Sequence, residues 1–173
     1  CSDTDVFLLL LHYYSQICTN TIFRCRDRDI DIGAVYNKLG DKKSMTLLGF
    51  HAFSGCDQTG KFCGFLKLSC FRSGDFVLNA FLNLGTDNVD WKQDIINLLH
   101  VFVLDLYQRS RPTEVKTLQS LRWYMFTKMQ CVSKKLPPTP SALEFAIKRS
   151  HFITHMWKKS NVAIPKYLPA EDY

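Results

Sequence analysis

The feature that most constrains this chain is an apolar helical run that stops at an abrupt turn, within residues 47–67. Apolar side chains recur at helical spacing from Met45 to Phe53, which favours a mostly buried helix over a strand. Ser54-Gly55 then ends the helix, because glycine takes a left-handed backbone without steric cost. The turn is therefore expected to deliver the carboxylate of Asp57 to a fixed position beside the core.

A loop that contains glycine and lysine follows this turn. Its backbone amides, together with the cations Lys61 and Lys67, can approach a phosphate group near Gly60 and Gly64. The alternative interpretation is an ordinary solvated connection between two helices.

A second acidic feature stands at the start of the sequence. Asp3 and Asp5 lead into the continuous apolar run Val6–Leu11, a pattern typical of a strand buried on both faces of a parallel sheet. In an extended segment, alternation places both carboxylates on one side, within reach of a single ion. The alternative is a solvated chain terminus.

Together, Ser2–Leu10 and the later turn Gly55-Cys56-Asp57 resemble the second half of a PIN-like nuclease domain of the flap-endonuclease type. In that superfamily an Asp-x-Asp strand end and a Gly-[Ser/Cys]-Asp turn both supply metal-binding carboxylates, and a glycine-rich turn and helix follow. The sequence of these motifs is most similar to that of a large group of animal proteins, many derived from mobile elements. Two further motifs of that group are present here, at Leu136–Thr139 and Trp157.

The resemblance implies phosphodiester hydrolysis with two Mg²⁺ or Mn²⁺ ions, which prefer oxygen ligands and together clamp the attacking water and the leaving oxygen. Asp3, Asp5 and Asp57 would be the catalytic metal ligands. The family site also uses acids from an earlier strand and helix. The resemblance therefore implies the distal half of a nuclease, incomplete and inactive as this fragment.

Two departures from the family pattern keep a non-catalytic alternative open. Gln58 stands where flap endonucleases have an aromatic residue, and Phe65-Leu66 replaces the glycine expected before Lys67. The alternative is a nucleic-acid-binding or protein-interaction remnant of a mobile-element protein, which kept the fold and lost the chemistry.

Composition indicates a globular domain, since 46% of the 173 residues are hydrophobic and 22% are charged. The longest apolar run, Val6–Leu11, is too short to cross a bilayer, so no membrane association is expected. Seven cysteines occur without a Cys-x-x-Cys motif, and Cys56, Cys63 and Cys70 recur every seven residues, which suits one side of a helix better than zinc geometry. We interpret these three as buried thiols of a reducing, intracellular compartment, with the nucleus favoured and no zinc. The start at Cys1 has neither an initiator methionine nor a signal peptide, so we expect a piece of a longer protein.

The whole pattern predicts a predominantly helical α/β fold: a small N-terminal parallel sheet of two or three strands, packed by helices and followed by a helical C-terminal region. We expect a strand at 21–26 and a self-paired charged turn at 26–31. Trp123 and Phe126 are expected in the core, and the alternative is a platform on which bases stack. Predicted helices span 33–39, 45–53, 75–84, 91–107 and 114–129, with a last one capped by Ser141. The predicted division is a partial nuclease domain at 1–133, a Lys/Pro linker at 134–140, and a C-terminal helix and tail at 141–173.

Charge is distributed unevenly along the chain. Residues 1–108 hold 10 Lys and Arg against 12 Asp and Glu, whereas residues 109–168 hold 12 against 2. A basic surface attracts phosphate backbones, although it also serves solubility. The predicted partner is nucleic acid, with DNA favoured over RNA, and the expected contact residues are Gly60, Lys61, Gly64, Lys67, Lys134, Lys135, Lys158 and Lys159.

Overall fold

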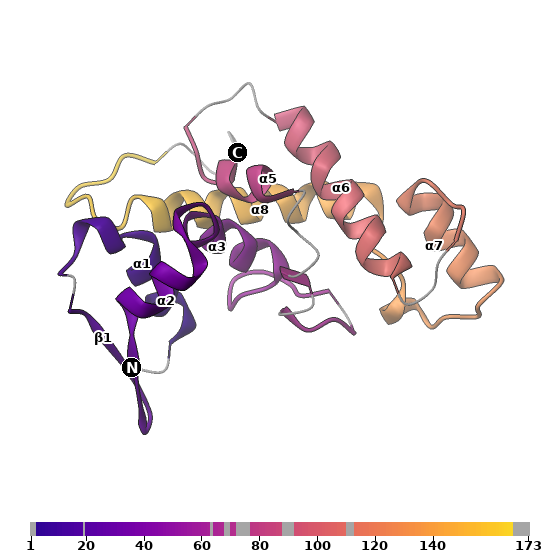
Figure 1. Ribbon diagram of the computed structural model, residues 1–173. Helices are drawn as coiled ribbons and strands as arrows, with labels where there is room; N and C mark the ends of the chain where they lie inside the picture. The colour runs from indigo at the N-terminus through magenta and orange to yellow at the C-terminus, as the bar shows by residue number, and fades with distance from the viewer. Residues whose placement is uncertain are drawn as a thin grey trace.

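The computed structural model describes residues 3–18, 20–62, 64–67, 70–71, 77–87, 92–109 and 113–167. Within them the chain is predominantly helical with one small sheet, as predicted. The molecule is elongated (Figure 1): the N-terminal elements lie at one end and α7 (Leu118–Thr127) at the other, and the long helix α8 (Pro140–Lys158) runs between them. None of the helices in the described ranges combines the length and apolar character needed to span a membrane.

The prediction of a strand at Val6–Leu11 is wrong, because this run lies in the helix α1 (Thr4–His12). The side chain of Asp3 caps the helix by accepting a hydrogen bond of 2.9 Å from the backbone N–H of Asp5. A continuous apolar run fits either a buried strand or a buried helix, and periodicity alone does not separate the two.

The sheet is an antiparallel hairpin rather than a parallel sheet, since β1 (Ile22–Cys25) pairs with β2 (Arg28–Asp31). The strand predicted at 21–26 is confirmed. The charged stretch after it folds back as the second strand, and Arg24 and Asp29 form an exposed ion pair of 2.7 Å across the hairpin. The stretch therefore pairs with the preceding strand and not with itself as predicted, because Arg24 lies before residue 26, and the tight turn makes the pairing antiparallel.

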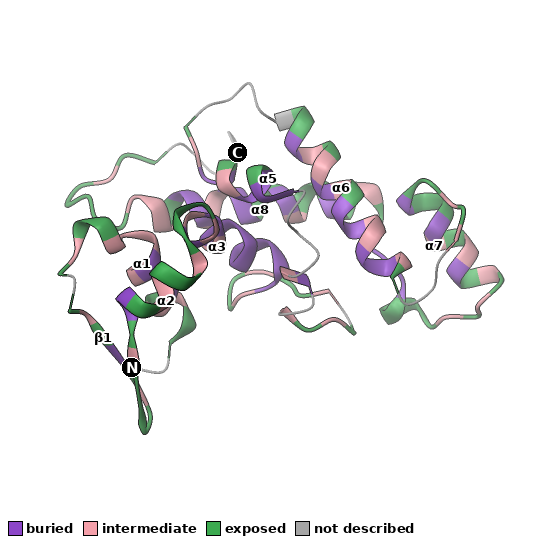
Figure 2. Ribbon diagram, viewed as in Figure 1, coloured by how far each residue is buried: buried purple, intermediate pink, exposed green. Residues whose placement is uncertain are grey.

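The helices predicted at 33–39 and 45–53 are confirmed as α2 (Ile32–Leu39) and α3 (Asp41–Ser54). Helix α3 occupies the centre of the molecule, where α1, α2, α8 and α5 (Leu78–Asn83) pack around it. Every residue from Leu48 to Ser54 is buried, as the purple colour of α3 in Figure 2 shows. A helix buried on all sides needs such an apolar sequence on every face.

The main core joins α3, α5 and α6 (Lys92–Gln108). Phe53, Phe81 and Phe102 come from these three helices, and the rings of Phe81 and Phe102 meet edge to face with centroids 5.4 Å apart. The helices predicted at 75–84 and 91–107 are confirmed over the described positions; residues 75, 76 and 91 lie outside them. Helix α8 packs against α3 and α6 and is capped by Thr139 rather than by Ser141.

Helix α7 is shorter than the predicted range 114–129, and its aromatic residues are not in the core. Its buried side carries Leu118, Leu121 and Met125, whereas Trp123 is 68% and Phe126 56% exposed. Because α7 lies at the end of the elongated molecule, neighbours cover only one of its faces (Figure 1). An apolar residue on the other face therefore stays on the surface.

Candidate functional site

The acids predicted to form a site line one pocket of about 920 Å³. They come from two elements: Asp3 and Asp5 from the start of α1, and Asp57 from the turn after α3. The pocket is lined by Asp3, Thr4, Asp5, His51, Gly55, Cys56, Asp57, Thr59, Gly60, Lys61 and Lys67. The structure thus brings together residues that are distant in the sequence.

The turn after α3 is built as the glycine pattern predicts. Gly55 has a φ of 116°, and a Cβ there would lie 2.5 Å from the Cβ of Lys61. Only glycine therefore lets the loop fold back so closely on the end of the helix. Thr59 holds the loop, because its Oγ1 donates to the carbonyl of Ala52 at 2.6 Å and accepts from the backbone N–H of Cys56 at 3.0 Å.

Cys56 lies on this loop, not on a helix shared with Cys63 and Cys70 as its spacing suggested. Its half-buried thiol contacts Thr59 Oγ1 at 3.2 Å and faces the pocket. Cys70 is buried, as expected, and Cys63 lies outside the described residues.

A chain of hydrogen bonds crosses the pocket wall through His51, a residue that the sequence pattern did not single out. His51 Nε2 lies 2.7 Å from Asp5 Oδ1, and His51 Nδ1 lies 2.6 Å from Lys67 Nζ. His51 lies in the last turn of α3 and is almost fully buried. The available sequence signal was a single basic residue inside an otherwise apolar helical run.

Burial lowers the pKa of His51, and the nearby Lys67 ammonium lowers it further, while Asp5 and Asp57 act in the opposite direction. The imidazole is therefore neutral at pH 7. Its Nε2–H donates to Asp5, and its Nδ1 accepts from Lys67, which is the tautomer that satisfies both partners.

Burial also lowers the pKa of Lys67, while Cys56, Asp5 and Asp57 oppose the shift. The ammonium of Lys67 lies close enough to Asp5 and Asp57 to offset part of their negative charge. The pocket combines acids that suit a cation with a lysine that suits a phosphate.

We expect the substitution Lys67→Met to raise the pKa of His51 toward its ordinary value of 6.5, because a cation that disfavours the imidazolium is removed. Titration of the ring nitrogen chemical shifts by NMR measures this pKa. Lys61→Met is the matched control, since Lys61 lines the same pocket but does not perturb His51. A His51 pKa that stays the same or falls in Lys67→Met contradicts the network.

The same shift gives a pH dependence of stability. Because the folded-state pKa of His51 lies below 6.5, the unfolded chain binds more protons in the window between the two values. The contribution of His51 to the free energy of unfolding is therefore fully present above pH 6.5 and is lost as the pH falls through this window.

The other predicted contact residues do not line this pocket, although Lys134 lines a neighbouring depression together with Gly60 and Lys61. Gly64 does not line the pocket, and Lys134 and Lys135 are exposed beyond α7. Lys158 and Lys159 are engaged within the molecule: Lys158 Nζ donates to the carbonyl of Leu82 at 2.7 Å, and Lys159 Nζ bonds to Asp87 at 2.9 Å. Burial lowers the pKa of Lys158 to about 8. These two lysines therefore stabilise the packing of α8 instead of presenting free cations.

The acids of the hairpin do not line the pocket. Asp29 pairs with Arg24, and Asp31 caps α2 by accepting from the backbone N–H of Ala34 at 3.1 Å. Asp27 faces a different surface depression.

The pocket offers carboxylate oxygens, the donors that Mg²⁺ and Mn²⁺ prefer. In the part of the chain that the structure describes, no group of three or more His, Cys, Asp or Glu side chains is arranged to hold a metal ion. Mg²⁺ often takes one or two carboxylates and completes its shell with water and substrate phosphates. Asp5 and Asp57 are the pocket carboxylates left for such an ion, since Asp3 caps α1, and Asp5 Oδ1 also accepts from His51.

Comparison with protein-family models, curated proteins and solved structures gives no match.

Proposed function

We propose that this chain carries part of the active site of a metal-dependent, PIN-like nuclease that hydrolyses nucleic-acid phosphodiesters. The observation that carries the proposal is the meeting of Asp3, Asp5 and Asp57 in one pocket with Lys61 and Lys67. Carboxylates and lysines in one pocket suit a site that must hold both a divalent cation and a phosphate.

In this proposal Asp5 and Asp57 bind Mg²⁺ or Mn²⁺, and Asp3 contributes from the rim. The metal would supply Lewis-acid stabilisation of the phosphoryl oxygens. Lys61 and Lys67 draw the phosphate into the pocket, and the loop near Gly60 allows a close backbone approach. His51 is a positioning residue, because its hydrogen bonds to Asp5 and Lys67 fix the orientation of both side chains.

A second candidate is the non-catalytic remnant that binds nucleic acid or another protein. The network Asp5–His51–Lys67 favours it, because His51 links the carboxylate of Asp5 to the ammonium of Lys67 within the protein itself.

We expect the purified chain to show no appreciable cleavage of single-stranded or flap DNA in Mg²⁺ or Mn²⁺, because the described residues provide an incomplete ligand set. Mn²⁺ should nevertheless raise the affinity of the chain for an oligonucleotide about three- to tenfold, compared with the affinity measured in EDTA. The reason is that an ion held by the pocket carboxylates would also attract a phosphate of the oligonucleotide. Fluorescence anisotropy of a labelled oligonucleotide measures the effect.

Asp57→Asn is the decisive variant for this experiment, and Asp27→Asn is its control, because Asp27 lies outside the pocket. The nuclease proposal predicts loss of the Mn²⁺ effect in Asp57→Asn alone. An affinity that Mn²⁺ does not change in the unmodified chain supports the non-catalytic candidate instead. Cleavage that Asp57→Asn abolishes would contradict the expected inactivity and would show a complete site.

A further inference from the structure

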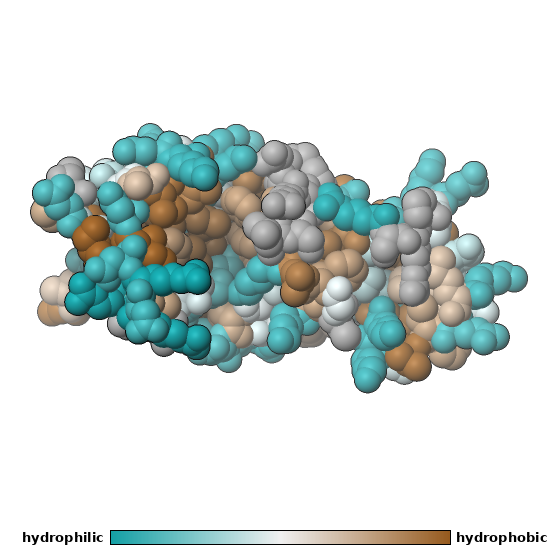
Figure 3. Space-filling view, turned by 60° about the horizontal axis from the view of Figure 1, so that its bottom comes forward, coloured by the Kyte–Doolittle hydropathy of each residue, from teal (hydrophilic) through white to brown (hydrophobic). Residues whose placement is uncertain are grey.

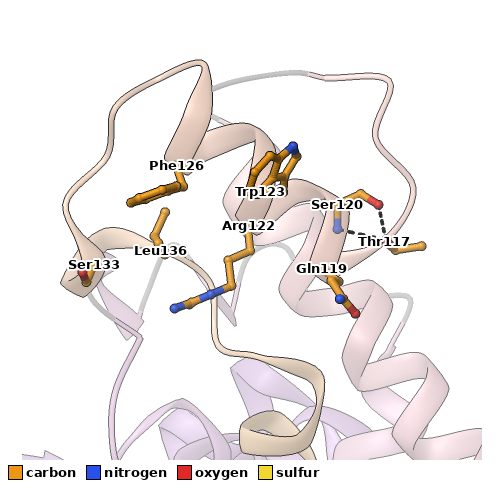
Figure 4. Close-up of a pocket in the computed structure, with 8 residues that line it drawn as sticks. All are labelled: Thr117, Gln119, Ser120, Arg122, Trp123, Phe126, Ser133 and Leu136. Atoms are coloured by element: carbon orange, nitrogen blue, oxygen red, sulfur yellow. Dashed lines mark hydrogen bonds between the residues drawn. The ribbon is translucent and has the colours of Figure 1, made fainter.

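The exposed face of α7 carries two aromatic side chains side by side. Trp123 and Phe126 are three residues apart, which places them on the same face of a helix. Both line a groove of about 700 Å³ whose other wall includes Leu136. In Figure 4, Phe126 lies over Leu136, and Trp123 stands between Phe126 and Ser120 on the same side of the helix.

The frame of this groove is held by specific bonds. Arg122 Nη1 donates to the carbonyl of Pro137 at 2.6 Å, which ties α7 to the segment after η3 (Ser133–Lys135). Thr117 caps α7 by accepting from the backbone N–H of Ser120 at 3.2 Å, one of the dashed bonds in Figure 4. The aromatic rings therefore project from a helix whose position is fixed by these two hydrogen bonds.

The charges around the groove are almost all positive. Residues 113–136 contain five cations and one acid, Glu114. Four of the cations are exposed, and each lies within two residues of a groove residue along the chain: Lys116, Lys128, Lys134 and Lys135. Figure 3 shows brown and pale side chains among hydrophilic ones at this end of the molecule.

We propose that this face of α7 binds single-stranded nucleic acid, with unpaired bases stacked on Trp123 and Phe126 and the phosphates near the four lysines. Charge complementarity favours a polyanion over a protein surface. The flat aromatic faces favour a single strand, because the bases of a duplex are already stacked on one another and expose only their edges.

This assignment deepens the proposed nuclease function by naming the strand form that the chain holds. A smaller depression lies between the groove and the acidic pocket, because Gly60 and Lys61 of the pocket line it together with Lys134 and Leu136. A single strand that occupied both sites would cross this depression. Binding at α7 requires no metal. It can be measured in EDTA, where a failure of the metal site has no influence on the result.

The test is fluorescence anisotropy with an oligodeoxythymidylate of about 15 nucleotides, in EDTA at low salt. We expect Trp123→Ala to weaken binding about tenfold and Phe126→Ala a few-fold, while Trp123→Phe keeps most of the affinity. Phe145→Ala is the matched control, because Phe145 is 67% exposed on α8 but does not line the groove, and it should bind normally. The unmodified chain should prefer the single strand over a duplex of the same length.

The double variant Lys134→Glu/Lys135→Glu should reduce the slope of log K against log salt by up to about 1.4, since each phosphate contact to a single strand contributes about 0.7. Three outcomes overturn the proposal. In the first, Trp123→Ala binds as tightly as the unmodified chain. In the second, a duplex binds as well as the single strand. In the third, sedimentation shows self-association that Trp123→Ala abolishes, which would make the face an interface between copies of this chain.

Discussion

The substitution Gly49→Ala is expected to destabilise the protein by about 3 kcal/mol, although alanine is the better helix former. Gly49 lies in the middle of α3 where α5 crosses it, and a Cβ there would clash with the carbonyl oxygen of Phe81 and lie 3.2 Å from the Cβ of Leu84. The first contact is with backbone, so relief requires the two helices to move apart. That movement opens the core around Phe53 and Phe81.

Thermal denaturation followed by circular dichroism measures the change, and about 3 kcal/mol corresponds to a fall in Tm of about 10 °C for a chain of this size. Gly60→Ala is the matched control, because nothing lies within 4 Å of a Cβ at Gly60. The control should stay within about 0.5 kcal/mol of the unmodified protein. A Gly49→Ala variant as stable as this control would contradict the close packing of α3 on α5.

The helices around the core could be predicted because their patterns are unambiguous. Helix α2 ends at Gly40 and α3 at Gly55, both with positive φ, and each glycine follows an apolar periodic run in the sequence. The start of α1 could not be predicted in the same way. The run Val6–Leu11 has no polar residue to mark a helical period, so only its packing against α3 decides that it is a helix.

Although the strand prediction for Val6–Leu11 is wrong, Asp3, Asp5 and Asp57 still line one pocket, and there is a physical reason for this. A strand end and a helix N-terminus both place Asp3 and Asp5 at the edge of an apolar element that enters the core. Once that element packs beside α3, the acids lie near the turn that carries Asp57. The pairing partners of the acids, by contrast, depend on tertiary contacts, and for this reason His51 was not foreseen.

The exposure of the aromatic residues of α7 could not be predicted from the sequence. Hydrophobic character predicts burial only where a neighbour is present to cover the side chain, and α7 has such neighbours on one face only. The charge asymmetry identified a basic region, but it did not identify which cations are free. Lys158 and Lys159 are bonded within the fold, whereas Lys134 and Lys135 are exposed.

The second large effect concerns metal binding at the pocket. If Asp5 and Asp57 are ligands, each of Asp5→Asn and Asp57→Asn should weaken Mn²⁺ binding at least about tenfold, because an amide is a poorer ligand than a carboxylate for a hard cation. Asp5→Asn also removes the negative charge that accepts the hydrogen bond from His51. The two variants should therefore differ in the pKa of His51. That pKa should fall further in Asp5→Asn, since Asp5 contributes a hydrogen bond and a charge, whereas Asp57 contributes only a charge.

The position of Mn²⁺ on the folded chain tests the central claim most directly, and it does so without any assay of cleavage. Paramagnetic broadening of amide signals by trace Mn²⁺ should be concentrated at residues 3–5, 51 and 55–61, should be reversed by excess Mg²⁺, and should be lost in Asp57→Asn but not in Asp27→Asn. Broadening that is absent from these residues, or that centres on the hairpin acids at 27–31, would contradict a metal site in this pocket.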